Sequence, residues 1–208
     1  MRTLLVTMFV SLDGVVQAPG GPDEDRDGGF AHGGWAAPYI DDDILSRAIG
    51  GAAQADALLL GRLTYEEFAE HWPLAGPDDP IGSRWAAVPK YVASRTLTSV
   101  SWQNSTLLTG DTVAAVIELK KSDGGEIQVH GSGHLVQTLL EHDLVDELQL
   151  MVIPVVLGSG KRLFGGGAVP ARFALVGSAT TRSGVVVVRY VRAGAVEYGA
   201  VGPETGNW

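Results

Sequence analysis

The sequence contains no cysteine, and this absence excludes several kinds of chemistry. Disulfide bonds, thiolate nucleophiles and cysteine-ligated metals all need a residue that the chain lacks. A cysteine-free chain also fits a reducing compartment, and we expect a cytoplasmic protein. No apolar run approaches the roughly 18 residues of a membrane-spanning helix, and the apolar segment near the N-terminus lacks the flanks of a signal peptide.

Basic residues are scarce as well. The chain has 15 lysines and arginines against 24 aspartates and glutamates, which gives a formal net charge of -9. These basic residues do not cluster, so the positive surface that binds nucleic acid is not expected. A site for an anionic ligand must therefore be built from a few cations placed locally.

What the chain does contain is enough apolar material for one α/β domain: 208 residues, of which 45% are hydrophobic. Short apolar segments alternate with segments of helical periodicity. The pattern predicts strands at 3–10, 56–60, 90–93, 105–108, 127–129 and 146–156, and helices at 41–53, 62–72, 81–88, 112–119 and after 133. This alternation predicts a mainly parallel sheet with helices on both faces.

The last third of the chain changes character. Arg172–Thr181 and Val185–Arg192 have the pattern of two antiparallel strands joined at Ser183-Gly184, which predicts a β-hairpin at one edge of the sheet. We expect one domain over residues 1–192. Residues 193–208 are rich in glycine and are expected to form a flexible C-terminal tail.

Residues 11–39 form a long expected loop, and loops of this length often cover binding sites. The acidic stretch Asp23–Asp27 lacks the ligand spacing of a calcium loop, so we expect a solvent-exposed tip. Asp13 either forms an Asp-Gly turn or has a role at the substrate, by contacting it or by supplying a proton. Trp35 either stacks on a flat heterocycle or fills the core.

The stretch Glu126–Leu140 combines a short apolar strand, a glycine turn and a helical pattern. Gly131 and Gly133 allow close approach of a ligand, and the free N–H groups that begin the next helix attract an anion. The alternative is a tight turn in which Ser132 caps the helix. The turn is not a complete G-x-G-x-x-G motif, and residues 158–161 fail the P-loop pattern at both ends.

Polar turns also follow two other expected strands. Gly61, Arg62 and Thr64 follow one strand, and Ser94 and Arg95 follow the next. Because ligands bind at the carboxyl ends of parallel strands, we predict that these turns share one cleft with the glycine turn. Arginine forks, hydroxyls and backbone N–H groups suit a phosphate, although each arginine alone could be a surface ion-pair partner.

No metal site is predicted. His130 and His134 are four residues apart, but they lie on either side of the glycine turn and cannot share a helix face. The chain also lacks the His-Glu-x-x-His pattern of zinc hydrolases. Both histidines are therefore expected to be loop or capping residues rather than metal ligands.

Taken in order, these motifs resemble the dihydrofolate reductase-like superfamily, and specifically the C-terminal reductase domain of the bifunctional deaminase-reductase of bacterial riboflavin biosynthesis. The resemblance covers residues 3 to about 192, and it implies a three-layer α/β sandwich. The matching segments are Ser11-Leu12-Asp13-Gly14, Leu60-Gly61-Arg62-x-Thr64-Tyr65, Val92-x-Ser94-Arg95-Thr96-Leu97, Val129-x-Gly131-Ser132-Gly133, Leu144-Val145-Asp146-Glu147-Leu148 and Pro154-Val155-Val156-Leu157-Gly158-x-Gly160-Lys161-x-Leu163-Phe164.

The resemblance implies an NADPH-dependent reductase, commonly a homodimer, that transfers hydride to a C=N or C=O bond of a pterin or a related pyrimidine. It assigns the adenosine and its 2′-phosphate to the turns at 61–64 and 94–95, and the pyrophosphate to Gly131, Ser132 and Gly133. Arg95 is the reason to expect NADPH rather than NADH, because the extra dianion favours a charged fork.

Two positions depart from the riboflavin reductases. Those enzymes often carry a lysine where this chain has Thr7 and an acid where it has His130, so the substrate can differ. We include His130 and Trp35 among the residues expected to contact the substrate, and Asp13 is the candidate catalytic residue. Because of these departures, a non-catalytic NADP-binding sensor on the same scaffold is the alternative function.

Overall fold

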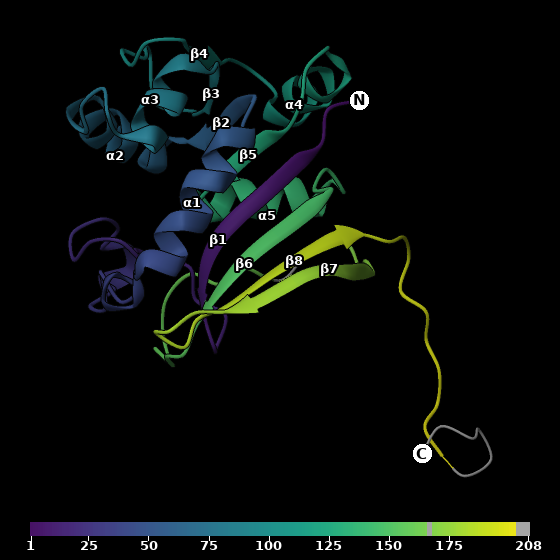
Figure 1. Cartoon of the computed structure of the whole chain (residues 1–208). Helices are drawn as coiled ribbons and strands as arrows, with labels where there is room; N and C mark the ends of the chain where they lie inside the picture. The colour runs from purple at the N-terminus through teal and green to yellow at the C-terminus, as the bar shows by residue number, and fades with distance from the viewer. Residues whose placement is uncertain (166–167, 203–208) are drawn as a thin grey trace.

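The computed structural model describes residues 1–165 and 168–202. Its centre is an eight-stranded sheet in the order β4-β3-β2-β5-β1-β6-β8-β7 (Figure 1). Neighbouring strands from β4 to β6 pair in parallel, and β8 and β7 continue the sheet in antiparallel pairing. The strands are β1 Leu4–Ser11, β2 Ala57–Gly61, β3 Lys90–Ala93, β4 Ser105–Leu108, β5 Ile127–His130, β6 Glu147–Ile153, β7 Phe173–Thr180 and β8 Val186–Arg192.

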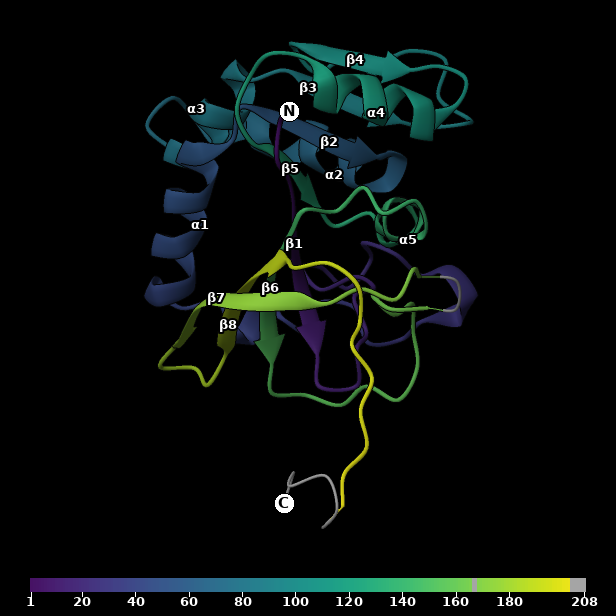
Figure 2. The same cartoon turned by 90° about the vertical axis from the view of Figure 1, so that its right-hand side faces the viewer.

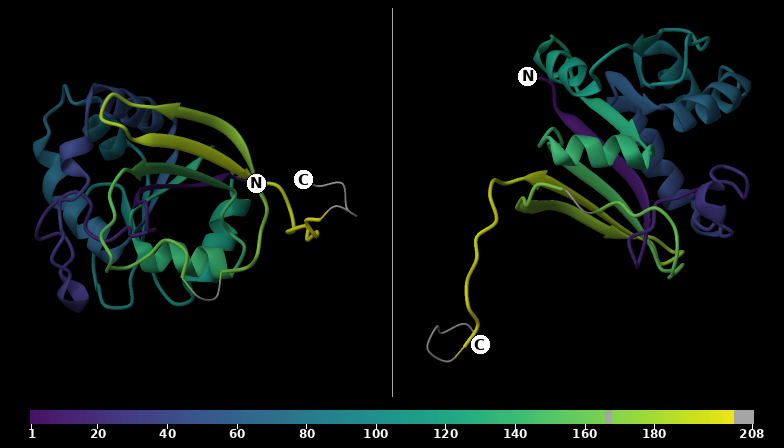
Figure 3. Two further views of the ribbon diagram at one scale, coloured as in Figure 1. Left: turned by 90° about the horizontal axis from the view of Figure 1, so that it is seen from below. Right: turned by 180° about the vertical axis from the view of Figure 1, so that it is seen from behind.

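Five α-helices are described, and they cover both faces of the sheet: α1 Asp42–Gln54, α2 Arg62–His71, α3 Pro80–Ala87, α4 Thr112–Lys121 and α5 Gly133–Glu141. Figure 2 shows α1 on one side of β1 and β6 and α5 on the other. Seen from behind, α5 lies in front of β1 and β6 (Figure 3). The predicted three-layer arrangement, a mostly parallel sheet with a C-terminal antiparallel hairpin, is therefore confirmed.

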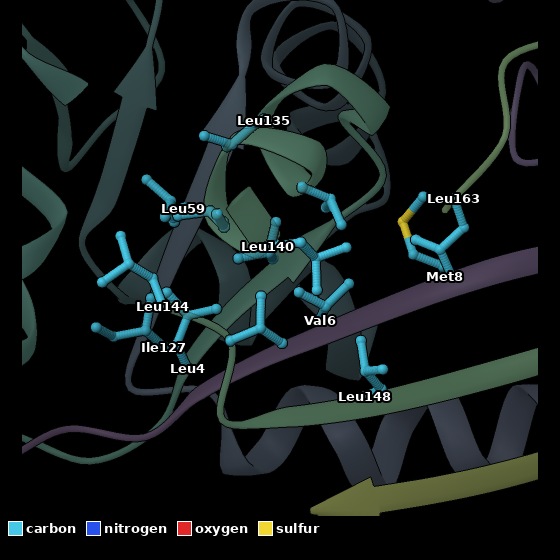
Figure 4. Close-up of a cluster of buried hydrophobic side chains, with 14 of the residues drawn as sticks. Leu4, Val6, Met8, Leu59, Ile127, Leu135, Leu140, Leu144, Leu148 and Leu163 are labelled. Carbon is cyan, nitrogen blue, oxygen red and sulfur yellow. The ribbon is translucent and has the colours of Figure 1, made fainter. Parts of the chain in front are cut away.

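The two faces of β1 explain this layering. Leu4, Val6 and Met8 pack with α5 in the main core, where ten buried side chains are labelled in Figure 4. Residues between them point to the opposite face, because side chains alternate along a strand. There Phe9 packs beside a second cluster that includes Ile44 of α1. The face of the sheet that carries Thr7 and Phe9 is also the face on which the cleft described below lies.

Several element ends differ from the expectation. The strand expected to reach residue 156 ends at Ile153, because Pro154 has no N–H to donate and the amide of Val155 bonds back to the carbonyl of Ile153 at 2.8 Å. The loop after β1 contains two short 3-10 helices, Asp27–Gly29 and Ala37–Tyr39. Residues 193–202 contain no helix or strand, and the rest of the expected tail, 203–208, lies outside the described residues.

Candidate functional site

A cleft of about 1220 Å³ opens where the parallel strands β2, β3 and β5 end. Its walls include the three polar turns, α1 and part of the loop that follows β1. All eight residues predicted to bind a cofactor line this cleft: Gly61, Arg62, Thr64, Ser94, Arg95, Gly131, Ser132 and Gly133. The three turns therefore share one cleft, as their positions along the chain predict.

Ser132 joins two of these turns. Its hydroxyl accepts a hydrogen bond from the amide of Gly61 at 2.8 Å and donates one to Oγ1 of Thr64 at 2.8 Å. A side chain at either glycine would disturb this contact: a Cβ on Gly61 would lie 2.8 Å from Oγ of Ser132, and one on Gly131, whose φ is +57°, would lie 3.0 Å from Oγ1 of Thr64. The glycines are thus needed because the turn after β2 and the turn after β5 are in direct contact.

The alternative role of Ser132, as a side-chain cap of α5, is wrong. The residue adopts a left-handed conformation (φ 61°, ψ 57°) and its side chain bonds to no amide of α5. Aspartates cap α1, α3 and α4, whereas α2 and α5 begin at the cleft with no side-chain cap. The first N–H groups of α2 and α5 are therefore left for another acceptor, and an anion suits them.

The two arginines of the cleft differ in their partners. Arg62 forms an ion pair with Glu66 at 2.8 Å on the surface of α2. Arg95 is exposed and has no ion pair or hydrogen bond within residues 1–165 and 168–202. The hydroxyl of Ser94 accepts hydrogen bonds from the amides of Thr96 and Leu97, so it shapes the turn that presents Arg95. Within the described residues, Arg95 is therefore the arginine of the three turns that remains available to a ligand.

The floor of the cleft carries polar side chains that the strand patterns alone did not reveal. Strand pairing aligns His130 of β5 with Thr7 of β1, and Thr7 with Gln149 of β6. All three line the cleft. Burial lowers the pKa of His130 to about 4, so its ring is neutral near pH 7.

Aromatic rings form one wall beside His130. The ring of Trp85 lies 4.7 Å from that of His130 and stacks on Phe68 at 4.9 Å, and Trp72 meets Trp85 edge-on. All four residues line the cleft. Such a wall suits a flat, apolar ring face.

Asp13 and Trp35 do not line the cleft. Asp13 accepts hydrogen bonds from the Ser11 hydroxyl and from the amides of Leu157 and Gly158, and these bonds lower its pKa to about 2. An ionised carboxylate at neutral pH does not donate a proton, so the geometry favours the turn-forming role. Trp35 is 8% exposed and donates its indole N–H to the carbonyl of Gln17, which favours the core-filling role.

The acidic stretch at 23–27 is not a fully solvated tip. Glu24 lines the cleft and accepts hydrogen bonds from the amides of Gly20 and Gly21, and burial raises its pKa. Lys161 binds Asp25 at 2.8 Å and Asp27 at 2.9 Å, which ties the loop to the segment after β6. In the described part of the chain, no group of three or more acidic or histidine side chains could hold a metal ion.

The sheet order and the C-terminal antiparallel hairpin define a dihydrofolate reductase-like fold. Within that class, the chain belongs to the family of the RibD C-terminal domain, whose model matches residues 2–187. An uncharacterized protein of Bacillus subtilis (strain 168), YyaP, is 29% identical over 197 residues, which cover 91% of this chain and 94% of the relative. No helix of the described residues is both long and apolar enough to span a membrane.

Two solved structures show the same fold. One is a protein provisionally assigned to riboflavin biosynthesis, from Shewanella sp. PV-4, with a TM-score of 0.65, 22% identity, and coverage of 92% of this chain and 99% of the other. The other is a diaminohydroxyphosphoribosylaminopyrimidine deaminase/5-amino-6-(5-phosphoribosylamino)uracil reductase from Thermotoga maritima. It gives a TM-score of 0.60 at 14% identity, and the alignment covers 92% of this chain and 57% of that longer chain.

Proposed function

We propose that the protein is an NADPH-dependent reductase of a pterin-like or aminopyrimidine substrate. The observation that carries the proposal is the contact between two glycine-containing turns at one cleft. Beside them lie two helix N-termini without a side-chain cap and Arg95, which has no partner in the described part of the chain. Membership of the RibD C-terminal domain family supports a reductase of this kind. The two proteins of similar structure, one assigned to riboflavin biosynthesis and the other a uracil reductase, support the substrate class.

The residues present fit a dinucleotide. The amides of Gly131–Gly133 and the start of α5 would hold the pyrophosphate, because their N–H groups have no competing side-chain cap. Arg95 would bind the 2′-phosphate through its free guanidinium, and the Thr64 hydroxyl borders the same cleft. Bound NADPH supplies the hydride, while the protein positions the reactants and excludes water.

A carboxyl group that lines the cleft is a candidate proton donor. His130 is neutral and Asp13 is ionised at neutral pH, so neither is a proton donor there. Glu24 lines the cleft, burial raises its pKa, and both of its hydrogen bonds go to Oε2, which leaves Oε1 without a partner in the described residues. We propose Glu24, rather than Asp13, as the acid next to the substrate.

The cofactor assignment is tested by calorimetric titration with NADPH and NADH. We expect wild-type protein to bind NADPH more tightly, and Arg95→Ala to lose about tenfold or more of that preference, since a hydrogen bond to a charged group contributes about 1.5–3 kcal/mol. Arg182→Ala, in the β7–β8 turn outside the cleft, is the matched control. Equal binding of both nucleotides by the wild type, or an unchanged preference in Arg95→Ala, would contradict the assignment.

The alternative is a protein that binds NADP without turnover. It is motivated by the uncharged pair Thr7 and His130 at positions that are often charged in the riboflavin reductases. Oxidation of NADPH, followed against dihydrofolate, oxidised pterins and the phosphoribosyl pyrimidine, separates the two functions. Efficient turnover of any of these compounds excludes the alternative, and tight NADPH binding with no turnover of the whole panel supports it.

A further inference from the structure

Three uncharged polar side chains form a row across the floor of the cleft. His130, Thr7 and Gln149 lie side by side on β5, β1 and β6, and neighbouring strands are about 4.8 Å apart. In the described part of the chain, the Thr7 hydroxyl, the Gln149 amide and Nδ1 of His130 have no hydrogen-bond partner. None of these atoms is among the buried partnerless ones, which are Nε1 of Trp85 and Oγ of Ser105. They are therefore accessible to a ligand in the cleft.

A chain of hydrogen bonds fixes how His130 can bind. Nε2 of Gln128 donates to the carbonyl of Gly51 at 2.8 Å and to Oε1 of Glu126 at 2.6 Å, so the amide oxygen of Gln128 faces the histidine. That oxygen lies 3.0 Å from Nε2 of His130 and can only accept, so Nε2 carries the hydrogen. Because the ring is neutral, Nδ1 is left as an acceptor that faces the cleft.

Two of the cations that line this part of the cleft, Lys161 and Arg189, are already paired with acids. Lys161 lies between two aspartates and Arg189 between two glutamates, so each cation is outnumbered by its acidic partners. Arg47, on α1, is exposed and is the remaining cation that lines the cleft outside the polar turns, with no partner in the described residues. Next to the row the floor is apolar, with Phe9 and Met151 two residues further along β1 and β6.

We propose that the row His130–Thr7–Gln149 recognises the hydrogen-bonding edge of an uncharged, flat heterocycle, and that the cleft selects a substrate without a phosphate group. The ligand presents an N–H donor to Nδ1 of His130, while Thr7 and Gln149 match donors or acceptors further along the edge. Gln128 is a positioning residue that acts through His130. This inference rests on the proposed function and names the substrate class of the same site.

The first test compares two ligands that differ only in the phosphate: 5-amino-6-ribosylaminouracil and its 5′-phosphate. Each is titrated into protein saturated with NADP⁺. We expect the phosphate-free compound to bind at least as tightly. Binding of the phosphate ester that is tenfold tighter would overturn the inference, and loss of that excess in Arg47→Ala would show where the phosphate binds. Failure of both compounds and of pterin to bind would also overturn it.

The second test removes members of the row. Thr7→Val and Gln149→Leu should each weaken pyrimidine binding about two- to tenfold, the range for one hydrogen bond, with NADP⁺ binding unchanged. Thr106→Val, on the exposed edge strand β4, is the matched control. Unchanged pyrimidine affinity in both row variants would refute the recognition role.

The third test observes the histidine directly. Nitrogen NMR of His130 should show the Nε2–H tautomer in wild-type protein and a mixture of tautomers in Gln128→Leu. An Nδ1–H tautomer in the wild type would overturn the role of Gln128. This outcome needs only the wild-type protein, so it decides the matter even if Gln128→Leu does not fold. NADP⁺ titration of the same samples keeps the two proposals apart: absent NADP⁺ binding refutes the proposed function, whereas normal NADP⁺ binding with a phosphate preference refutes only this inference.

Discussion

Ser132→Ala is the substitution that most directly perturbs the contact between the turns. The change removes the acceptor of the Gly61 amide and the donor to Thr64 Oγ1. Gly61 is buried, so its N–H loses a partner that water does not easily replace. An unsatisfied buried donor costs about 1–3 kcal/mol, and we expect the free energy of unfolding to fall by about 1–2 kcal/mol.

Urea denaturation measures this loss, and the chain provides a matched control. Ser105 Oγ is buried in β4 and has no hydrogen-bond partner in the described residues. Ser105→Ala therefore removes an unsatisfied group and should leave stability unchanged or raise it. The double variant Ser132→Ala/Thr64→Val should lose less stability than the sum of its single variants, because both single changes break the same hydrogen bond.

Two results would refute this account of Ser132. One is a Ser132→Ala variant that unfolds at the same urea concentration as the wild type. The other is strict additivity of Ser132→Ala and Thr64→Val, since independent residues do not couple. The affinity for NADPH should fall together with stability in Ser132→Ala, because the glycine turn then loses its attachment to the turn after β2.

Three further predictions address protonation and packing. Burial lowers the pKa of His130 from 6.5 to about 4, so the unfolded chain binds the extra proton between these values. Stability should therefore fall as the pH drops through this window, and His130→Gln should flatten the dependence in urea midpoints. The ammonium group of fully buried Lys90 donates to three carbonyls, including those of Trp85 and Val88. Because Lys90→Met leaves these carbonyls without their donor, it should lower the free energy of unfolding, measured by thermal denaturation, by about 2–4 kcal/mol. If Glu24 is the acid, turnover of the wild type falls as the pH rises and Glu24 loses its proton. The Glu24→Gln variant should not show this fall, and a pH profile like that of the wild type would exclude Glu24 as the acid.

Much of the fold could be predicted from local patterns. The apolar strands, the helical periodicity and the glycine turns are local properties, and they gave the strand–helix alternation and the hairpin. The strand expected at 146–156 is longer than β6, and the cause is also local, because Pro154 ends the strand pairing. The position of the three polar turns at one cleft was predictable because each places polar residues directly after a strand.

The rest of the candidate site could not be predicted, because it depends on contacts between distant segments. Thr7 and Gln149 become neighbours of His130 only when β1 lies between β5 and β6. Thr7 was visible as a polar residue in an apolar strand, but its partners were not. Glu24 sits in an acidic stretch typical of a solvated loop, and its place at the cleft follows from the folding of that loop.

The central claim is that the turns at 61–64, 94–95 and 131–133 together hold the phosphates of NADPH. Amide chemical shifts recorded during NADPH titration test it most directly, because they report each backbone N–H separately. We predict the largest changes at Gly131, Ser132, Gly133, Arg95 and the first residues of α2, with smaller changes in the β7–β8 hairpin. Saturable binding whose largest shifts lie away from these turns, or no shift at all, would contradict the account.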